Sequence, residues 1–579
     1  MKNIIFTLLF IFCFSFSKSQ TTDKDNINSD QIAGLCKVWG LVKFYHPDVT
    51  KRKIDWDKVL IKKYPEFSVN QDFESYNQNI IQLLDTLNQK SYSKETTDEQ
   101  FNAIINDKIE TLDNFSFLSD TNKYINRISF SWINDSIFSK KNQYKLAKIL
   151  VNYKPYESKQ LKGNTVVKHK DNKFEELDSI TEPYRVLGLF RYWNIINYYF
   201  PYKQLSDNNW DSVLTNAIPA FIKADNYESY IKQTLLLSSK INDTHGRILY
   251  STTKYDKTTS DQKKKEGYVP YNFRLIDSNV VVSKVLVDSA VLKLGDIVLK
   301  IDTTDLRNFR DSRNRYKSYS TIQSQTIYFE LALTNTYSSK FNFTIIRDLD
   351  TLSLLETQLV SWKTKWESKY NKGAYHYSLN DKAGYVDLTE IKFGKLKKTL
   401  KKFKNKEIIV FDLRGYPNTV AWLALPHLLS KKPKCVATYY KPNKEYPGTY
   451  INESKGMRYR FWLVKPFLFL RKQYKGKIVV LINSEAISQS ETVCMMFKAY
   501  SNKVTFIGTP TTGANGNVST IDMPGGISFW FTSLDWHFPN GDQLQRIGIV
   551  PDIYVKETIE GVKLGKDQIL ERAIQFTEN

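Results

Sequence analysis

The feature that most constrains the fold is a series of short apolar runs in the C-terminal part of the chain. They lie at 383–388, 407–413, 478–482 and 504–508, and more polar stretches separate them. Strands that are apolar on both faces must be covered on both faces, which is typical of a mostly parallel sheet between layers of helices. Residues 362–579 are therefore predicted to form an α/β domain.

A serine-rich turn at 483–491 joins one of these runs to a helix. The run 477–482 before it predicts a buried strand, and 492–500 after it predicts a helix. Because helix N-terminal amides converge at such a turn, Ser488 lies where a developing oxyanion could be held. The same segment is also typical of a purely structural N-cap, with Glu491 in the first helical turn.

An internal repeat of aromatic-rich segments organises the N-terminal half. Its anchors recur at one constant offset, as Trp39, Pro47 and Trp56 in the first copy and Trp193, Pro201 and Trp210 in the second. Each copy predicts a helix that stops at proline, a loop, and a second helix that opens with Trp-Asp. The two copies predict helical domains at 20–180 and 181–250, and not a solenoid, which needs more and shorter repeats.

A β-rich region follows a polar stretch at 251–267, which predicts an exposed loop or linker. The apolar patterns predict strands, among them 279–286, 326–331 and 341–346. The segment Leu-Gly-Asp-Ile-Val-Leu at 294–299 is similar to the part of a PDZ domain where a short helix ends and a strand begins. PDZ domains bind extended peptides at a sheet edge. We therefore expect a PDZ-like domain at 268–357, with an unrelated small β-domain as the alternative.

The chain is strongly basic, with 83 Lys and Arg against 61 Asp and Glu and a formal net charge of +22. The densest basic run, 392–406, predicts an amphipathic helix with Leu396, Leu400 and Phe403 on its inner face. Its outer face is either solvated or in electrostatic contact with an anionic envelope surface. No zinc-finger, RNA-recognition or helix-turn-helix motif accompanies the charge, so no nucleic-acid partner is expected.

Residues 1–19 have the charged start, short apolar core and small-residue end of a secretory signal, with cleavage expected near Ser19. We therefore expect an exported protein, located in the periplasm, on the cell surface or outside the cell. Three cysteines remain, Cys36, Cys435 and Cys494, and they lack the number for a disulfide framework and the spacing for zinc. No phosphate-binding glycine-rich loop occurs either, so we expect no metal and no cofactor.

Five stretches from about residue 245 to 560 resemble one family in their order and spacing. They are 242–246 (Asn-Asp-Thr-His-Gly), the PDZ-like segment, 411–417 (Phe-Asp-Leu-Arg-Gly-Tyr-Pro), 488–491 (Ser-Gln-Ser-Glu), and 508–516 together with 545–552. Together they resemble the serine peptidases that include the C-terminal-processing (tail-specific) proteases and the tricorn core protease. The resemblance implies a ClpP/crotonase-like α/β catalytic domain.

Within that resemblance, Ser488 corresponds to the nucleophile, and a serine hydroxyl needs a base to attack a carbonyl. The C-terminal-processing branch uses a lysine where this chain has Ala514, so a Ser-Lys dyad is excluded at that position. The tricorn branch uses an upstream histidine, and His245 fits it. The resemblance also implies that Thr244 and Gln545 orient the base.

The chain departs from the family at two further positions. Gln545 replaces an acid, and an amide cannot stabilise an imidazolium by charge. Pro417 lies in the loop that supplies oxyanion donors and has no amide N–H. The expected donors are then the amide of Gln489 and one amide from Gly415 or Asn418.

These expectations together describe an exported serine endopeptidase that cleaves polypeptides held by a PDZ-like module. His537, in the aromatic segment 534–541, is a rival base, or a residue that lines the substrate cleft. One alternative is a catalytically impaired envelope protein that keeps the fold and binds peptides or a hydrophobic ligand. Another is a protein that binds anionic surfaces through the basic run.

Overall fold

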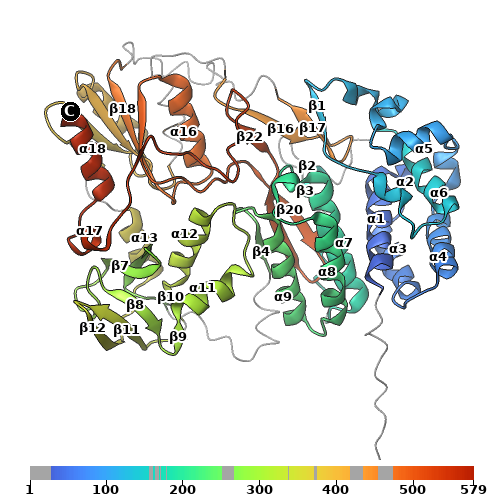
Figure 1. The fold of residues 1–579 in the computed structure, drawn as a ribbon, viewed down its shortest axis with the longest axis horizontal. Helices are drawn as coiled ribbons and strands as arrows, with labels where there is room; N and C mark the ends of the chain where they lie inside the picture. Colours follow the sequence, from blue (N-terminus) through green and yellow to red (C-terminus); the bar gives the residue numbers. More distant parts are fainter. Residues whose placement is uncertain are drawn as a thin grey trace, which may run out of the picture.

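The computed structural model contains a helical N-terminal half, a small β-rich unit and an α/β unit (Figure 1). It describes residues 28–578 apart from 156–160, 163–167, 170, 178, 251–266, 337, 371–374, 418–420, 422–434 and 454–473. The predicted signal segment, 1–19, lies outside the described residues. No described helix is both long and apolar enough to cross a membrane.

The two repeat copies have the same local structure. The first contains α1 (Ser29–Tyr45) and α3 (Trp56–Lys63), and the second contains α7 (Glu182–Tyr199) and α8 (Trp210–Lys223). In each copy the indole N–H of the second tryptophan donates to the backbone carbonyl of the first, over 3.1 Å. The four tryptophans are buried, so the repeated aromatic positions form the contact between the paired helices.

Further short helices complete the helical half. The α-helices are α2 (Pro47–Thr50), α4 (Phe73–Asp85), α5 (Asp98–Ile105), α6 (Lys140–Val151) and α9 (Tyr227–Ser238). 3₁₀ segments lie at Tyr64–Glu66, Gln89–Tyr92, Ile109–Thr111, Asp113–Ser119, Ser131–Asn134, Lys203–Leu205 and Ser239–Ile241.

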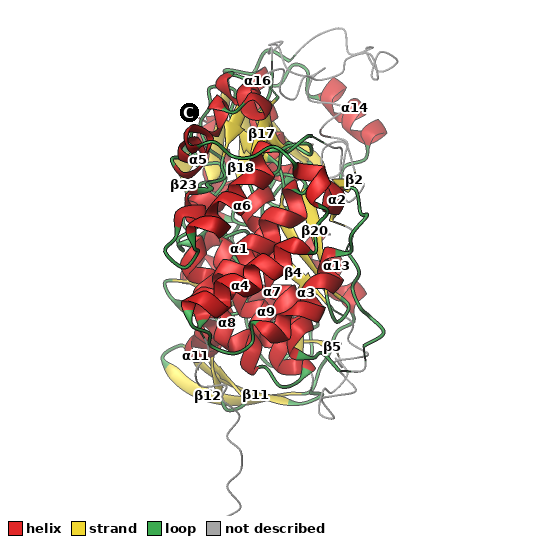
Figure 2. Cartoon of the chain, turned by 90° about the vertical axis from the view of Figure 1, so that its right-hand side faces the viewer, coloured by secondary structure: helices red, strands yellow, loops and turns green. Residues whose placement is uncertain are grey.

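A hairpin from the C-terminal part packs into the helical half. Its strands, β20 (Val518–Met523) and β21 (Ile527–Thr532), share one apolar core with α1 and α7. The sheet order is β2-β3-β20-β21-β4, with β2 at Leu161–Lys162, β3 at Lys168–His169 and β4 at Arg247–Leu249. Figure 2 shows helices of this half covering β4 and β20. The region predicted at 362–579 is therefore not one separate body, because this hairpin completes the helical core.

The β-rich unit is a sheet of order β12-β11-β8-β7-β6, with β9 paired to β8. Its elements are β6 (Tyr271–Ile276), β7 (Asn279–Val285), β8 (Ile297–Ile301), β9 (Thr304–Asp305), α11 (Leu306–Asn314), α12 (Ile322–Ala332), β11 (Phe341–Arg347) and β12 (Asp350–Glu356). The strand predicted at 326–331 is wrong, because these residues lie in α12. A capping box of Thr321 and Ser324 starts that helix, and local capping outweighs the apolar run. Short strands β5 (Gly267–Tyr268) and β10 (Asn335–Thr336) pair beside it.

The α/β unit has a six-stranded sheet of order β13-β14-β15-β18-β19-β23. Its strands are β13 (His376–Ser378), β14 (Ala383–Asp387), β15 (Ile408–Asp412), β18 (Lys477–Ile482), β19 (Val504–Gly508) and β23 (Ile553–Tyr554). All neighbouring pairs are parallel except the edge pair β13–β14. The mostly parallel sheet predicted from the apolar runs is therefore confirmed.

Helices cover both faces of this sheet. One face packs against α14 (Phe393–Lys402) and α16 (Gln489–Tyr500), and the other packs against α18 (Gln568–Glu578). Within the described residues, the other helices of the C-terminal part are α13 (Trp362–Tyr370) and α17 (Ile559–Lys563). The α14 helix is amphipathic as expected, since Leu396 and Leu400 are buried while its lysines are exposed.

A fourth sheet links the α/β unit to the helical half. Its order is β1-β17-β16-β22, with β1 at Tyr124–Asn126, β17 at Thr449–Asn452, β16 at Thr438–Pro442 and β22 at Asp535–His537. Strand β1 thus comes from the first helical domain and the other three from the C-terminal part. This sheet and the hairpin β20–β21 place the segments around residues 245 and 532 beside one another.

Candidate active site

Ser488 lies at the strained junction between β18 and α16. Its backbone has φ 54° and ψ −106°, a combination that costs energy for any residue except glycine. Its amide donates to the Ala514 carbonyl over 3.0 Å, and its carbonyl accepts the Thr492 amide over 3.0 Å. The surrounding contacts therefore hold Ser488 in an unfavourable conformation at the start of a helix, where the helix amides face outward.

Glu491 ties this junction to the neighbouring turn. Its buried carboxylate accepts hydrogen bonds from the Thr511 hydroxyl (2.6 Å) and from three backbone amides, those of Gly513 (2.7 Å), Ala514 (3.0 Å) and Ser488 (3.2 Å). Burial raises the pKa of Glu491 to about 7, while these four donors act in the opposite direction. Glu491 thus accepts hydrogen bonds from both turns and links them, in addition to its place in the first turn of the helix.

Glu491→Ala should lower the free energy of unfolding by about 3 kcal/mol or more, because it leaves several buried donors without an acceptor. The thermal unfolding midpoint measures this loss. Glu228→Ala is the matched control, since Glu228 is an exposed acid in the first turn of α9. We expect the control to cost only about 0.3–1 kcal/mol. Equal midpoints for the two variants would contradict the bridging role of Glu491.

His245 is held by a hydroxyl and a carboxylate. Its Nδ1 lies 2.9 Å from Thr532 Oγ1, and that hydroxyl lies 2.9 Å from Asp243 Oδ1. Asp243 is fully buried, and its Oδ1 lies 3.8 Å from the imidazole Nδ1. If Thr532 donates to Asp243, it accepts from Nδ1–H, and Nε2 is then the unprotonated ring nitrogen. The arrangement therefore favours the tautomer that a general base needs.

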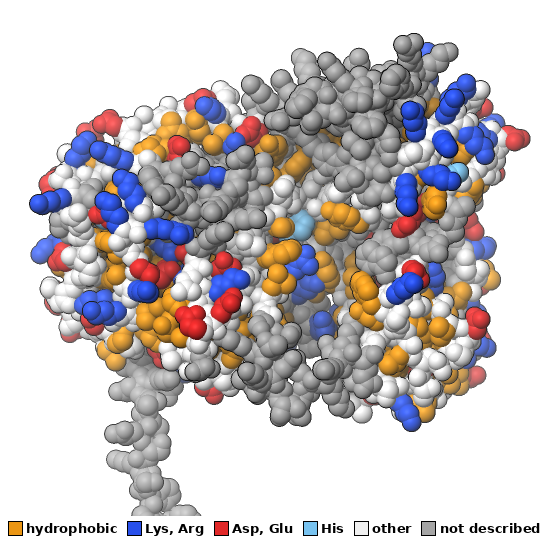
Figure 3. Space-filling model, turned by 180° about the vertical axis from the view of Figure 1, so that it is seen from behind, with side chains coloured by type: hydrophobic (Ala, Val, Ile, Leu, Met, Phe, Trp, Pro, Cys, Tyr) orange, Lys and Arg blue, Asp and Glu red, His pale blue; other side chains and the backbone are white. Residues whose placement is uncertain are grey.

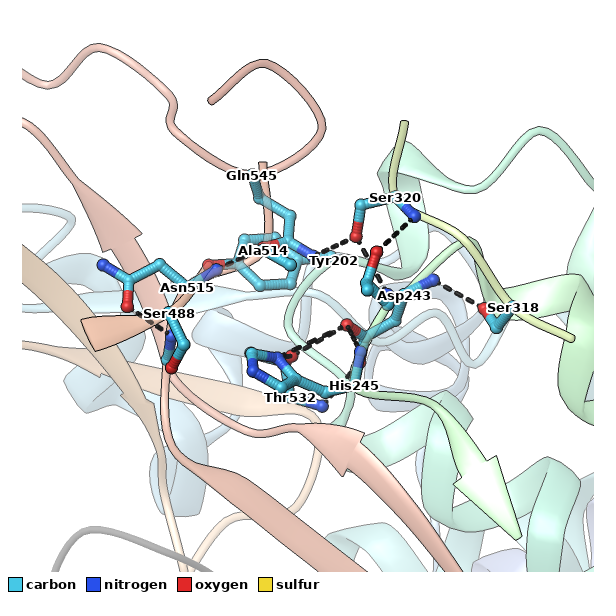
Figure 4. Close-up of polar contacts among 12 residues, drawn as sticks. Tyr202, Asp243, His245, Ser318, Ser320, Ser488, Ala514, Asn515, Thr532 and Gln545 are labelled. Atoms are coloured by element: carbon cyan, nitrogen blue, oxygen red, sulfur yellow. Dashed lines mark hydrogen bonds and ion pairs between the residues drawn. The ribbon is translucent and has the colours of Figure 1, made fainter. Parts of the chain in front are cut away.

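The imidazole lies between the Thr532–Asp243 pair and Ser488 (Figure 4). No hydrogen bond joins His245 to Ser488 among the described residues. In unliganded sites catalytic hydrogen bonds are often long or poorly aligned, and they tighten when a substrate binds. The structure thus brings the predicted nucleophile and the predicted base to one place.

Among the described residues, Thr244 and Gln545 form no hydrogen bond with the imidazole, contrary to the expectation that they orient it. Thr244 exchanges two hydrogen bonds with Ser320, through its amide (3.0 Å) and its hydroxyl (2.9 Å). Gln545 donates to the Ser320 hydroxyl and accepts from the Asn515 amide, each over 3.3 Å. Together they connect the segment that carries His245 to the turn beside Ser488.

The residues that hold the imidazole are Thr532, directly, and Asp243, through the Thr532 hydroxyl, and the sequence analysis missed both. Asp243 was detectable, because it stands two residues before His245 in the same Asp-Thr-His stretch. Thr532 was not, since only the pairing of β21 with β4 brings it to the ring.

The rival base, His537, is already engaged. Its Nε2 lies 2.8 Å from Asp535 Oδ1, and its Nδ1 lies 3.1 Å from the Gly541 carbonyl. Burial lowers the pKa of His537, but its contact with the Asp535 carboxylate outweighs burial, and the pKa is raised. A histidine that is more readily protonated and already paired is a poorer general base than His245.

The oxyanion donors are only partly described. The Gln489 amide lies in the first turn of α16, at the positive end of the helix dipole. Gly415 uses its carbonyl to accept from the Ser490 hydroxyl over 2.7 Å, which fixes the loop against the same helix. Pro417 has no N–H to donate. Asn418 lies outside the described residues.

Arg414 holds this loop at the end of β15. Its guanidinium contacts both oxygens of Asp412, at 3.1 and 2.7 Å, and both oxygens of Asp567, at 2.6 and 2.7 Å. A bidentate pair of this kind fixes geometry as well as charge. The loop beside Ser488 is therefore held in place by Arg414, which binds a carboxylate on each side.

A cavity of about 980 Å³ lies between the β-rich unit and the α/β unit. Arg274 of β6 and Glu330 of α12 line one side, and Gly415, Asn483 and Glu485 line the other. Arg274 crosses it with contacts to Glu330 (3.0 Å) and to Glu485 (2.5 Å). The cavity therefore connects the β-rich unit with the two loops that flank Ser488.

Comparisons with known proteins bear on the family and on the fold. The model of Peptidase family S41 matches residues 382–555. The solved structure of mature CPAF complexed with lactacystin is similar over 69% of this chain and 98% of its own, at 14% identity and a TM-score of 0.52. This likeness establishes a shared fold.

Two further structures are similar at lower scores. The photosystem II D1 C-terminal processing protease covers 66% of this chain and 98% of its own, with 15% identity and a TM-score of 0.38. The tricorn protease covers 69% of this chain and 37% of its own, with 13% identity and a TM-score of 0.32. No curated protein matches the sequence. From the family match, the chain carries a domain of peptidase family S41, a family of serine-type peptidases, within a larger multidomain fold.

Proposed function

We propose that this chain is a serine endopeptidase with Ser488 as nucleophile and His245 as general base. The observation that carries the proposal is a strained serine at a helix start, near an imidazole whose Nδ1 is held by Thr532 and, through it, by Asp243 (Figure 4). That arrangement supplies a half-buried serine hydroxyl and a correctly oriented base together.

Nε2 of His245 takes the proton of the Ser488 hydroxyl while Oγ attacks the scissile carbonyl carbon. The amide of Gln489 stabilises the oxyanion that forms, with a second donor from the Gly415 loop. His245 then gives its proton to the leaving amine, and the acyl-enzyme remains on Ser488. Water, deprotonated by the same imidazole, hydrolyses the ester and restores the serine.

Asp243 supplies the charge that the family places at position 545. Its carboxylate stabilises the imidazolium through the Thr532 hydroxyl, since the direct distance of 3.8 Å is too long for a hydrogen bond. The neutral Gln545 is then no obstacle to catalysis. This assignment removes one of the two reasons for treating the chain as a binding protein without activity.

The β-rich unit serves to capture an extended polypeptide beside α12 and β6, as a PDZ-like module does. Two groups on this edge of β6 are occupied within the chain. The Leu275 amide donates to Glu330 over 2.8 Å, and the Tyr271 carbonyl accepts from Lys365 over 2.5 Å. A strand that adds to this edge must displace both side chains. The neighbouring cavity offers the bound segment a route to Ser488.

We further propose export of the chain, which rests on the signal pattern of residues 1–19. The N-terminal residue of the mature protein, determined by mass spectrometry after expression in a bacterium, tests this step. A mature chain that begins at Met1 would contradict it.

A fluorophosphonate probe should label the protein at Ser488, which peptide mapping identifies. Ser484→Ala, in the same turn, should keep the label, whereas Ser488→Ala should lose it. Absence of labelling together with retained peptide binding would favour the alternative, an inactive binding protein. The missing amide at Pro417 is the observation that favours that alternative.

The rate of labelling should rise with pH with a midpoint below 6.5. Burial and then the charge of Arg247 lower the pKa of His245 from its usual 6.5, while Asp243 raises it and only partly offsets them. Because the base acts only when unprotonated, a lowered pKa moves the acidic limb to lower pH. Arg247→Gln should move the midpoint upward, and Lys398→Gln, on the exposed face of α14, should leave it unchanged. A midpoint above 6.5 in the unaltered protein would contradict this account.

A further inference from the structure

Three basic side chains lie on the segments that adjoin His245. Arg247 follows the histidine by two residues and begins β4, where it pairs with Trp530 of β21. Lys317 directly precedes Ser318, whose hydroxyl accepts the Asp243 amide over 2.7 Å. Arg313 lies one helical turn before Lys317, at the end of α11. In the part of the chain that the structure describes, none of the three forms an ion pair with an acid.

Each of the three cations lies against an aromatic ring. The Arg247 guanidinium lies 4.4 Å from the centre of the Trp530 ring, and Arg313 lies 5.4 Å from that of Phe309. The Lys317 ammonium lies over the ring of Tyr328. Stacking on a ring fixes a guanidinium while its N–H groups at the edge stay available. The cluster is thus ordered without neutralisation of its charge.

The cluster is electrostatically unfavourable as it stands. Burial, followed by the charges of Arg313 and Arg247, lowers the pKa of Lys317 to about 7. The same Arg247 lowers the pKa of His245, so one member of the cluster also acts on the proposed base. Like charges held together without a counter-ion are stabilised when an anion binds between them.

The cluster lies on segments that adjoin the proposed base, Arg247 on β4 two residues after it and Lys317 next to Ser318, which binds the Asp243 amide. Figure 3 shows basic and hydrophobic side chains together around a histidine in the furrow between the two halves of the molecule. A net charge of +22 adds a long-range attraction for acidic polypeptides, which raises their rate of encounter.

We infer that Arg247, Arg313 and Lys317 form a subsite that binds a carboxylate of the substrate next to the scissile bond. The carboxylate is that of an Asp or Glu side chain or that of the chain terminus. The inference rests on the proposed function, because it assigns a substrate class to the same site. It makes this chain a peptidase that prefers acidic polypeptides.

Protection of Ser488 from a fluorophosphonate probe tests the subsite. The competitors are blocked decapeptides that alternate Ala with Glu, Gln or Lys, and a fourth Ala-Gln decapeptide with a free C-terminal carboxylate. The Glu peptide should protect at a concentration about tenfold lower than the blocked Gln peptide. If the chain terminus is the natural ligand, the free-carboxylate Gln peptide protects as well as the Glu peptide does.

Charge reversal gives the sharper comparison. The double variant Lys317→Glu with Arg313→Glu should lose the preference for the Glu peptide and be protected best by the Lys peptide. The control Lys398→Glu, on α14, should still be protected at the lowest concentration by the Glu peptide. If the charge-reversed double variant does not fold, the neutral double variant Lys317→Gln with Arg313→Gln takes its place. It should be protected equally by the Glu and Gln peptides. Arg247 is left intact because it also acts on His245.

Equal protection by the Glu, Gln and Lys peptides in the unaltered protein would overturn the subsite and leave the proposed function standing. Failure of the probe to label Ser488 at all would instead count against the proposed function. In that case fluorescence anisotropy of the labelled Glu and Gln peptides decides the subsite separately. Tighter binding of the Glu peptide supports it, and equal binding overturns it.

Discussion

His245→Ala should lower the rate of Ser488 labelling and the kcat for any peptide substrate by roughly 10⁴-fold or more. Without the imidazole the proposed base is gone, and Ala514 offers no substitute at the position where the resemblance places a lysine. His537→Ala is the matched control and should change either rate by less than about threefold, because His537 is engaged by Asp535 and Gly541.

The two histidine variants also distinguish His245 from His537 as the general base. A large loss of labelling rate in His537→Ala, with little effect in His245→Ala, would identify His537 of β22 as the general base. Circular dichroism and the unfolding midpoint establish that each variant is folded before the rates are compared.

Asp243→Asn should lower kcat by about 10²- to 10³-fold. Loss of a buried acid behind a catalytic histidine costs about 10⁴-fold where the acid contacts the ring directly. Here the carboxylate reaches the ring through Thr532, so the expected loss is smaller. Asp243→Asn should also lower the pKa of His245 further, because Asp243 raises it. The acidic limb of the rate profile should therefore move to lower pH as the rate falls.

Thr532→Val tests whether the carboxylate acts through the hydroxyl. It removes the bridge at nearly constant volume and should reproduce most of the loss in Asp243→Asn. The double variant should be little worse than either single one, because both changes break one chain of contacts. Gln545→Ala should cost far less, since Gln545 does not touch the imidazole. If Gln545→Ala lowered kcat as much as Asp243→Asn does, Gln545 would be a residue that orients the base.

Local patterns in the sequence were enough to predict the parts of the fold that depend on neighbours in the chain. The apolar runs predicted the parallel sheet, and the run before residue 483 located the junction that carries Ser488. The Trp and Pro spacing predicted helices that end and begin where α1, α3, α7 and α8 do. Each of these rests on local periodicity or capping, which a sequence displays directly.

Features that depend on distant pairing could not be predicted. Thr532 and His245 are 287 residues apart, and only the register of β21 with β4 brings them together. The hairpin β20–β21 alternates in burial like many strands, and nothing local indicates that it packs against α7. The segment 326–331 has the β-branched and aromatic residues of a strand, but the cap at Thr321 places it in a helix.

Chemical rescue of His245→Gly tests the central claim most directly. The labelling rate of Ser488 would be measured with and without added imidazole across pH. We predict a very slow rate that free imidazole restores in part, with a pH dependence that follows the titration of imidazole in solution. Labelling of His245→Gly at the unaltered rate without imidazole would contradict His245 as the base.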